Sequence, residues 1–146
     1  MAVGYSKIFC KHYHKQPKAL KANSQKQDKK MRDYKKYTIW QEGHKITLAV
    51  YALTHKFPRE ELYGITSQLR RAVSSVLTNI AEGCGRDTDL DFRRFLVIAL
   101  GSATETEYLL LLSFDLNYIE ETKYFELNTQ IVVLRKQLRN LIDKLK

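Results

Sequence analysis

Residues 66–107 read TSQLRRAVSSVLTNIAEGCGRDTDLDFRRFLVIALGSATETE and hold the clearest structural pattern of the chain. Apolar residues recur in the first half of this stretch at three- and four-residue steps, the spacing of one buried helix face. They are Leu69, Ala72, Val73, Val76, Ile80 and Ala81. Gly83-Cys84-Gly85 predicts the end of this helix in a left-handed glycine cap. Thr88 followed by Asp91 resembles a capping box, so a second helix starts there and the stretch forms a helical hairpin.

Two more helices flank the hairpin. The first is predicted from Thr38, capped by its own side chain together with Gln41, to about Lys56, before Phe57-Pro58. The last helix follows residues 120–122 and reaches the C-terminus. Its apolar residues step by four and three, the pattern of a heptad, with one more residue widening the stripe. They are Leu127, Ile131, Leu134, Leu138, Leu141 and Leu145, and the widening residue is Ile142.

The composition and the helical patterns together predict an all-α protein. The chain has 146 residues with only two prolines and six glycines, enough for one compact domain. Four helices with short links favour an antiparallel up-down-up-down four-helix bundle over residues 31–146. Since no apolar run reaches the ~20 residues that span a bilayer, we expect a soluble, cytoplasmic protein without membrane contact.

Residues 1–30 differ from the rest of the chain and are called the lysine-rich arm. They hold eight lysines and one acidic residue, a net charge of +7, whereas residues 31–146 hold seventeen basic and fifteen acidic residues, a net charge of +2. The arm has no sustained apolar period, so we expect it to be disordered and basic. It is either a solvated tail, the favoured interpretation, or an arm that binds nucleic acid.

The helix predicted over residues 90–117 is apolar on more than one side. Such a helix in a small bundle is either deeply buried or part of a subunit interface. In its middle, Gly101 and Ser102 cost helix propensity but would let another backbone approach closely. We therefore predict a homo-oligomer interface at Leu100, Gly101 and Ser102.

The sequence holds no pattern typical of a catalytic or cofactor site. There is no Glu-x-x-His motif of a metal-binding bundle and no phosphate-binding glycine loop after a strand. Cys10, His12 and His14 have ligand-like spacing but no second cluster, and Cys84 has no base beside it in the sequence. We expect no metal, no cofactor and no enzymatic activity.

The remaining candidate residues are charged or polar groups near apolar ones. Asn79, Glu82 and Glu105 are predicted to be structural polar residues, and a buried carboxylate would need a basic partner. Five arginines around the hairpin could supply that partner or could bind phosphate, which guanidinium groups contact in a bidentate manner. They are Arg70, Arg71, Arg86, Arg93 and Arg94.

The spacing of these arginines leaves two interpretations open. Ion pairs with Asp89 at i,i+4 and with Asp91 at i,i+3 are favoured for Arg93 and Arg94, respectively. For Arg71 and Arg86, pairing and phosphate binding are equally plausible, since Glu82 can reach Arg86.

Four segments resemble a known family. They are Ile39-Trp40-Gln41, residues 64–72 (GITSQLRRA), Asn79-Ile80-Ala81-Glu82-Gly83 with Arg86, and the stretch from Phe95-Leu96 through Ala99-Leu100-Gly101-Ser102 to Glu105. They are similar to the bundle proteins encoded in intervening sequences of bacterial 23S rRNA genes, and to accessory proteins of diversity-generating retroelements. The resemblance covers about residues 31–146. It implies a four-helix bundle, a homopentamer, a basic surface for nucleic acid and, for the retroelement branch, a reverse-transcriptase partner.

We therefore expect a non-enzymatic, homo-oligomeric four-helix bundle that binds RNA or DNA through clustered basic residues. The alternative is a protein–protein adaptor or scaffold that binds no nucleic acid. Salt separates the two, because phosphate contacts weaken steeply as the salt concentration rises.

Overall fold

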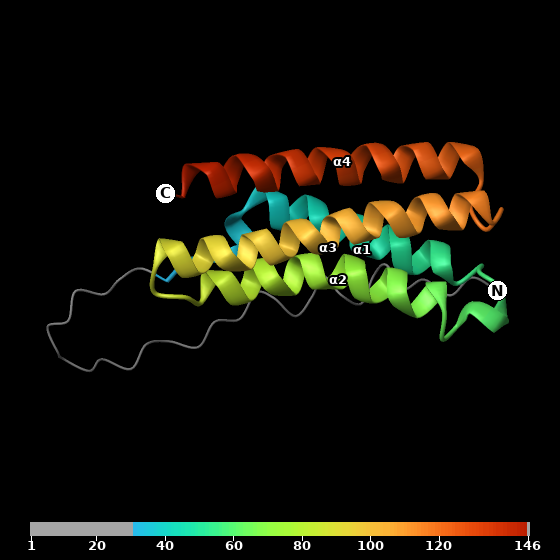
Figure 1. Cartoon of the computed structure of the whole chain (residues 1–146), viewed down its shortest axis with the longest axis horizontal. Helices are drawn as coiled ribbons and strands as arrows, with labels where there is room; N and C mark the ends of the chain where they lie inside the picture. The colour runs from blue at the N-terminus through green and yellow to red at the C-terminus, as the bar shows by residue number, and fades with distance from the viewer. Residues whose placement is uncertain (1–30, 146) are drawn as a thin grey trace, which may run out of the picture.

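The structure, a computed structural model, describes residues 31–145, so the expectations for the lysine-rich arm lie outside the described residues. Over residues 31–145 the protein is all-helical, as predicted, and has no strand. The helices are α1 (Thr38–Thr54), α2 (Ile65–Cys84), α3 (Asp89–Asp115) and α4 (Glu121–Lys144), with short 3-10 helices η1 (Tyr34–Lys36) and η2 (Arg59–Glu61). The four α-helices lie side by side along the long axis of the molecule (Figure 1).

One apolar core holds the four helices together. The helix α2 packs against α1 and α3, and α4 packs against α1 and α3. Every helix contributes fully buried side chains to this core, because each has a stripe of apolar residues that faces the other helices. The largest of them are Val50 of α1, Leu69, Val73 and Ile80 of α2, Phe92, Leu96 and Leu110 of α3, and Leu127, Ile131, Leu134, Leu138 and Ile142 of α4.

The start of α3 has the predicted cap. The Asp91 amide donates to the Thr88 hydroxyl oxygen at 3.0 Å, and that hydroxyl donates to the Asp91 carboxylate at 2.6 Å. The acidic first turn of α3 also places negative charge at the positive end of the helix dipole. The short link of residues 85–88 therefore turns the chain directly from α2 into α3.

The predicted left-handed glycine cap of α2 is wrong. Gly85 caps the helix with φ −80° and ψ −2°, in the right-handed region, and its amide donates to the carbonyls of Glu82 and Gly83. A different constraint explains Gly83, which lies inside the last turn of α2. A Cβ atom there would be 2.7 Å from the Phe95 Cβ and 2.9 Å from a Phe92 ring carbon. Glycine at this position lets α2 and α3 approach closely.

The predicted cap of α1 is also wrong. Tyr37 is the N-cap residue and makes no side-chain cap hydrogen bond, while the Gln41 side chain donates to the Lys35 carbonyl at 2.8 Å. The helix ends at Thr54, before the predicted Lys56. Thr54 is buried, and its hydroxyl donates a hydrogen bond to the Val50 carbonyl at 2.9 Å, so this buried polar group has a partner.

The buried stripe of α4 drifts away from the predicted heptad. Tyr124 and Ile142 are buried with the central residues of the stripe, whereas Leu141 and Leu145 are only half-buried. A straight helix has 3.6 residues per turn, so a strict seven-residue repeat rotates off the core unless the helices supercoil.

The residues before α1 are attached to the α2–α3 link. The Arg32 guanidinium donates to the Arg86 carbonyl at 2.9 Å, forms an ion pair with Asp89, and lies 4.9 Å from the centre of the Phe92 ring. The Tyr37 ring lies 5.8 Å from the same phenylalanine. Asp89 therefore pairs with Arg32. The spacing within α3 had predicted Arg93 as the partner of Asp89, and that prediction is wrong.

The start of α1 and the end of α4 meet at one end of the bundle. Tyr37 and Thr38 line a hollow together with Asn140, Leu141 and Lys144. Figure 1 shows both chain ends of the described part at this end, beside the α2–α3 link.

By length and composition alone α3 could also cross a membrane, a test that the core helix of a soluble protein passes too.

Candidate nucleic-acid interface

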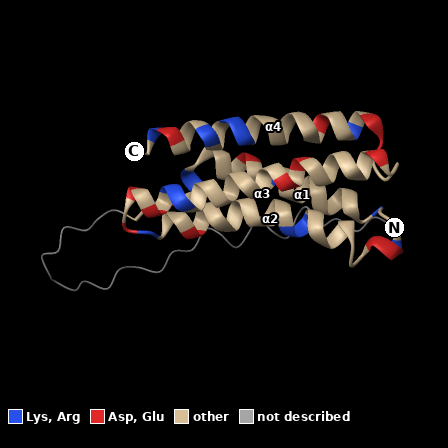
Figure 2. Cartoon of the chain, in the orientation of Figure 1, with Lys and Arg blue, Asp and Glu red and all other residues tan. Residues whose placement is uncertain are grey.

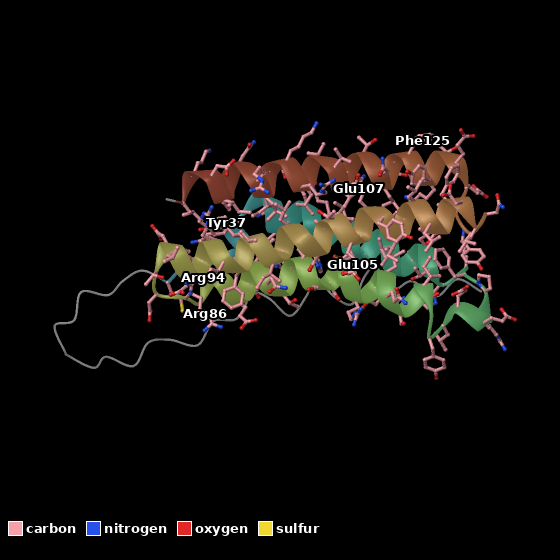
Figure 3. The ribbon with its side chains drawn as sticks, viewed as in Figure 1. Tyr37, Arg86, Arg94, Glu105, Glu107 and Phe125 are labelled. Atoms are coloured by element: carbon pink, nitrogen blue, oxygen red, sulfur yellow. The ribbon has the colours of Figure 1, made fainter. Side chains whose placement is uncertain are left out.

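The five predicted arginines do not form one cluster. Arg70 and Arg71 lie in the first half of α2, while Arg86, Arg93 and Arg94 lie in and just after the α2–α3 link. At ~1.5 Å per residue, Arg71 is about 20 Å along α2 from the end of that helix. In Figure 3, Arg86 and Arg94 lie near the α2–α3 link, and Glu105, which faces Arg71, lies near the middle of the bundle.

Two of these arginines are held in contacts within the bundle. The Arg70 Nε donates to the Thr54 hydroxyl at 2.8 Å, and its guanidinium lies 5.0 Å from the centre of the Tyr51 ring, so it joins α2 to α1. Arg86 pairs with Glu82 at 2.8 Å, which is one of the two interpretations that its spacing left open, and lies 4.6 Å from the centre of the Phe95 ring.

The other three arginines differ in how firmly they are held. Arg94 pairs with Asp91 at 3.4 Å, which confirms the predicted i,i+3 pair. Arg71 has a side chain that is 77% exposed and lies 4.0 Å from Glu105, a contact that contributes little at such exposure. Arg93 is half-buried, has no ion pair within residues 31–145, and lines a hollow with Leu90 and Asp143.

A second basic cluster on α4 was missed by the sequence reasoning. Over residues 131–145 the chain has four basic residues and one acidic residue, a net charge of +3. Residues 31–130 have twelve basic and fourteen acidic residues, a net charge of −2. The positive charge of the folded part therefore belongs to the C-terminal half of α4, where the basic segments gather in Figure 2.

Three of these residues form what we call the basic stripe: Arg135, Lys136 and Arg139. Their spacing puts them on neighbouring positions of one side of the helix. Lys136 and Arg139 are exposed and have no ion pair within residues 31–145. The i,i+1,i+4 spacing was visible in the sequence, but the total charge of residues 31–146 concealed it.

The basic stripe borders a groove between α3 and α4. Two adjoining hollows of about 320 and 300 Å³ share Arg135 and make up this α3/α4 groove. Its lining from α3 is Leu100, Thr104, Glu107, Tyr108 and Leu111, and from α4 it is Tyr124, Asn128, Val132, Arg135, Lys136, Arg139 and Asn140. The groove thus combines apolar surface with cationic side chains.

An ion pair crosses the α3/α4 groove. Arg135 of α4 donates to the Glu107 carboxylate of α3, which lies between the two helices in Figure 3. Both side chains are about one third exposed, at 35% and 29%. The Arg135 Nε is buried and has no hydrogen-bond partner within residues 31–145. Among the described residues that line the groove, Glu107 is the single acidic one, and Arg135 already neutralises it.

The predicted structural polar residues lie in less apolar settings than expected. Asn79 is half-buried and donates to the Ser75 carbonyl at 2.7 Å and to its hydroxyl at 3.1 Å. Glu82 and Glu105 are exposed, contrary to the expected apolar environment, so neither carboxylate requires a buried partner.

The three residues of the predicted oligomer interface point in different directions. Leu100 lines the α3/α4 groove, and Ser102 donates to the Ser75 hydroxyl of α2 at 3.0 Å. Gly101 is exposed, and a Cβ atom there would meet nothing within 4 Å. The close approach expected at Gly101 is therefore not made inside the chain.

Cys84 is buried in the core beside the α2–α3 link. Burial raises the pKa of its thiol from 9.0 to about 11, so it is protonated at neutral pH and is a weak nucleophile. Within residues 31–145 no three His, Cys, Asp or Glu side chains are grouped so that they could hold a metal ion. Cys10, His12 and His14 lie outside the described residues.

Comparison with known proteins gives a family and a solved relative. The model of a family described as 23S rRNA-intervening sequence protein matches residues 35–140. A crystal structure of a protein of unknown function from the S23 ribosomal protein family of Bacteroides thetaiotaomicron is 26% identical, with a TM-score of 0.67. That similarity covers 72% of this chain and 98% of the Bacteroides protein. No curated protein matches the chain.

Proposed function

The chain belongs to the 23S rRNA-intervening sequence protein family, and we propose that it is a non-enzymatic, homo-oligomeric, cytoplasmic bundle that binds RNA or DNA. The observation that supports nucleic-acid binding best is the charge distribution along α4. Residues 31–130 have a net charge of −2, whereas residues 131–145 have a net charge of +3. Phosphate backbones are attracted to such a local concentration of Lys and Arg, and the sum over the whole folded part matters less.

The two unpaired members of the basic stripe are the proposed phosphate contacts. Lys136 and Arg139 are exposed and have no ion pair within residues 31–145. Forming a phosphate contact there would not require breaking an existing ion pair. Arg93, half-buried and also without an ion pair in the described part, is the predicted arginine that fits this role best. Arg86 and Arg94 would first have to leave Glu82 and Asp91.

The proposed homo-oligomer would use the outer face of α3 on its α2 side. Ile98, Gly101 and Glu105 recur there at three- and four-residue spacing, and Ile98 is 52% exposed. The open space at Gly101 would allow a neighbouring backbone to approach. Repeating the basic stripe around an assembly would let weak single contacts act together.

We further propose that the helices follow an antiparallel up-down-up-down order. Short links of residues 85–88 and 116–120 join α2 to α3 and α3 to α4, and the start of α1 lies beside the end of α4. Short connections favour antiparallel neighbours in a bundle.

A salt-dependent binding experiment on the full chain tests the nucleic-acid proposal. Fluorescence anisotropy with a labelled oligonucleotide is measured for wild type and for Lys136→Ala combined with Arg139→Ala. We expect the double variant to bind more weakly and the slope of log affinity against log salt to fall by about 0.7–0.9 for each phosphate that is no longer bound. Circular dichroism should be unchanged, since exposed substitutions usually cost little stability.

The matched control removes the same charge elsewhere. Lys45 pairs with Glu42, three residues before it, and Lys123 pairs with Glu126, three residues after it. Both lysines lie outside the basic stripe. Lys45→Ala with Lys123→Ala should therefore leave the salt slope nearly at its wild-type value. Equal losses in both double variants would mean that only net charge matters. No binding by the wild type at physiological salt would favour the adaptor alternative.

A further inference from the structure

Two exposed aromatic side chains flank one end of the α3/α4 groove. Tyr108 is 59% exposed and lines the groove from α3. Phe125 is 54% exposed and lies on α4, one helical turn before the lining residue Asn128. Figure 3 shows Phe125 near the start of α4. A single exposed ring is common, but two exposed rings beside one groove form an apolar patch of the kind that marks a binding site.

The exposed Phe125 ring packs against two other aromatic rings of the bundle. Its centre lies 5.3 Å from the Tyr124 ring and 6.4 Å from the Phe114 ring, and those two rings stack on each other at 4.5 Å. Tyr124 is buried in the core. A ring held in this way loses little side-chain entropy when a ligand covers it.

The aromatic residue and the cations follow one another along the same face of α4. Phe125, Val132, Lys136 and Arg139 are separated by seven, four and three residues, which is the spacing of a single helix face. From Phe125 to Arg139 the face extends over about 21 Å at ~1.5 Å per residue. One end of this face is aromatic and the other is cationic.

We propose that the α3/α4 groove binds an unpaired nucleic-acid strand, with bases stacked on Tyr108 and Phe125 and phosphates on Lys136 and Arg139. The inference rests on the proposed function and adds the strandedness of the ligand. At ~3.4 Å per nucleotide of a stacked strand, the face accommodates on the order of six nucleotides. A positively charged groove combined with aromatic side chains on which bases stack is how proteins hold single strands without reading their sequence.

An unpaired strand fits the groove better than a duplex does. A duplex presents phosphates to its surroundings and keeps its base faces stacked inside, so Tyr108, Phe125 and the apolar lining at Leu100 and Leu111 would have no partner. In a single strand the base faces are available to aromatic and apolar side chains. The proposal therefore accounts for the apolar and the cationic parts of the groove together.

The deciding experiment separates stacking from charge. Full-length protein is titrated by anisotropy with oligothymidine and oligouridine strands of about twelve nucleotides, a length within the range of known single-strand sites. Two further probes are an abasic strand with the same number of phosphates and a duplex of the same length. We expect the affinity of the base-bearing strands to be at least about tenfold higher than that of the abasic strand, because each stacked base adds to the binding free energy.

The protein variants then locate the stacking. Tyr108→Ala combined with Phe125→Ala should lose about tenfold or more in affinity for oligothymidine, and leave affinity for the abasic strand unchanged. Tyr108→Phe with Phe125→Tyr keeps both rings and should bind like wild type. Tyr63→Ala is the matched control, because Tyr63 is 91% exposed, lies between η2 and α2, and does not line the groove. Circular dichroism confirms that each variant is folded.

The outcomes distinguish this inference from the proposed function. Equal affinity for base-bearing, abasic and duplex probes, or an alanine pair that binds oligothymidine like wild type, overturns single-strand stacking. In that case a loss of affinity in the Lys136→Ala, Arg139→Ala variant would still support nucleic-acid binding. If the wild type binds none of the four probes, both proposals are wrong, and an acidic amphipathic helix of a partner protein becomes the occupant to test.

Discussion

Replacing Gly83 by alanine should destabilise the bundle, although the same replacement normally stabilises a helix. Glycine inside a helix is less favourable than alanine by roughly 0.5–1 kcal/mol, so the propensity term favours Gly83→Ala. The new methyl group, however, would lie 2.7 Å from the Phe95 Cβ and 2.9 Å from a Phe92 ring carbon. Overpacking a well-packed site costs about 1–3 kcal/mol.

The steric term should win at Gly83 because neither neighbour can move easily. The Phe95 Cβ is attached directly to the α3 backbone, and Phe92 is 1% exposed in the core. The clash cost is therefore expected in the upper part of its range, which leaves a net loss of about 1–2 kcal/mol in the free energy of unfolding. Relief of the clash would require α2 and α3, which pack closely at Gly83, to move apart.

Gly101→Ala is the matched comparison within a helix. Within a single chain a Cβ atom at Gly101 would meet nothing within 4 Å, so at protein concentrations where the bundle is monomeric the propensity term acts alone and should raise stability by about 0.5–1 kcal/mol. Urea unfolding followed by circular dichroism measures both variants, at concentrations where wild type and variant have the same mass. A Gly83→Ala variant as stable as Gly101→Ala would refute the reasoning, since it would mean that α2 and α3 separate at no cost.

Three more predictions concern the assembly, the arm and the buried thiol. Gly101→Leu should reduce the oligomeric mass in native mass spectrometry, and a wild-type mass would place Gly101 in open solvent within the assembly as well. Deleting residues 1–30 should leave helicity and the unfolding midpoint unchanged, because the family match begins at residue 35; a large loss would show that the arm is structural. In a Cys10→Ser background Cys84 should resist alkylation below pH 9 unless urea is added. Its pKa is raised by burial, so the unfolded state loses the thiol proton first, and stability should fall between pH 9 and about 11; fast alkylation of the native protein at pH 8 would contradict this burial.

The helices could be predicted from the sequence because their determinants are local. The apolar spacing of α2 and the Thr88–Asp91 cap involve residues within a few positions of one another, and both appear in the structure. The caps predicted at Thr38 and Gly85 failed for a related reason. Tyr37 is the N-cap residue of α1 and makes no side-chain cap bond, and Gly85 caps α2 in the right-handed region, so the residue type near a helix end fixed neither the cap bond nor the backbone conformation.

The contacts between distant segments could not be predicted in the same way. The spacing within α3 suggested Arg93 as the partner of Asp89, but Arg32 lies 57 positions earlier and occupies that carboxylate. Gly83 was interpreted as a helix end, whereas its reason is the approach of two phenylalanines from α3. Local patterns carry no information on which side chains another helix brings close.

The candidate site shows the same division. The basic stripe is a local pattern and could have been found by counting charge along α4 alone. The α3/α4 groove, by contrast, can be predicted only if it is known which helix packs beside α4 and that Tyr108 of α3 and Asn128 of α4 lie at the same position along the two helices. The five arginines chosen from the sequence lie along one hairpin, but the helix length separates Arg70 and Arg71 from the others.

The meeting of the two ends of the described chain makes the bundle a candidate for circular permutation. Tyr37 and Thr38 line the same hollow as Leu141 and Lys144, so a linker could join the end of α4 to the residues before α1. New ends could then be opened in residues 116–120, where Asn117 has a positive φ of 60°. In such a permutant α4 would become the first helix, and a reporter fused to either new end would emerge at the opposite end of the bundle from the α2–α3 link.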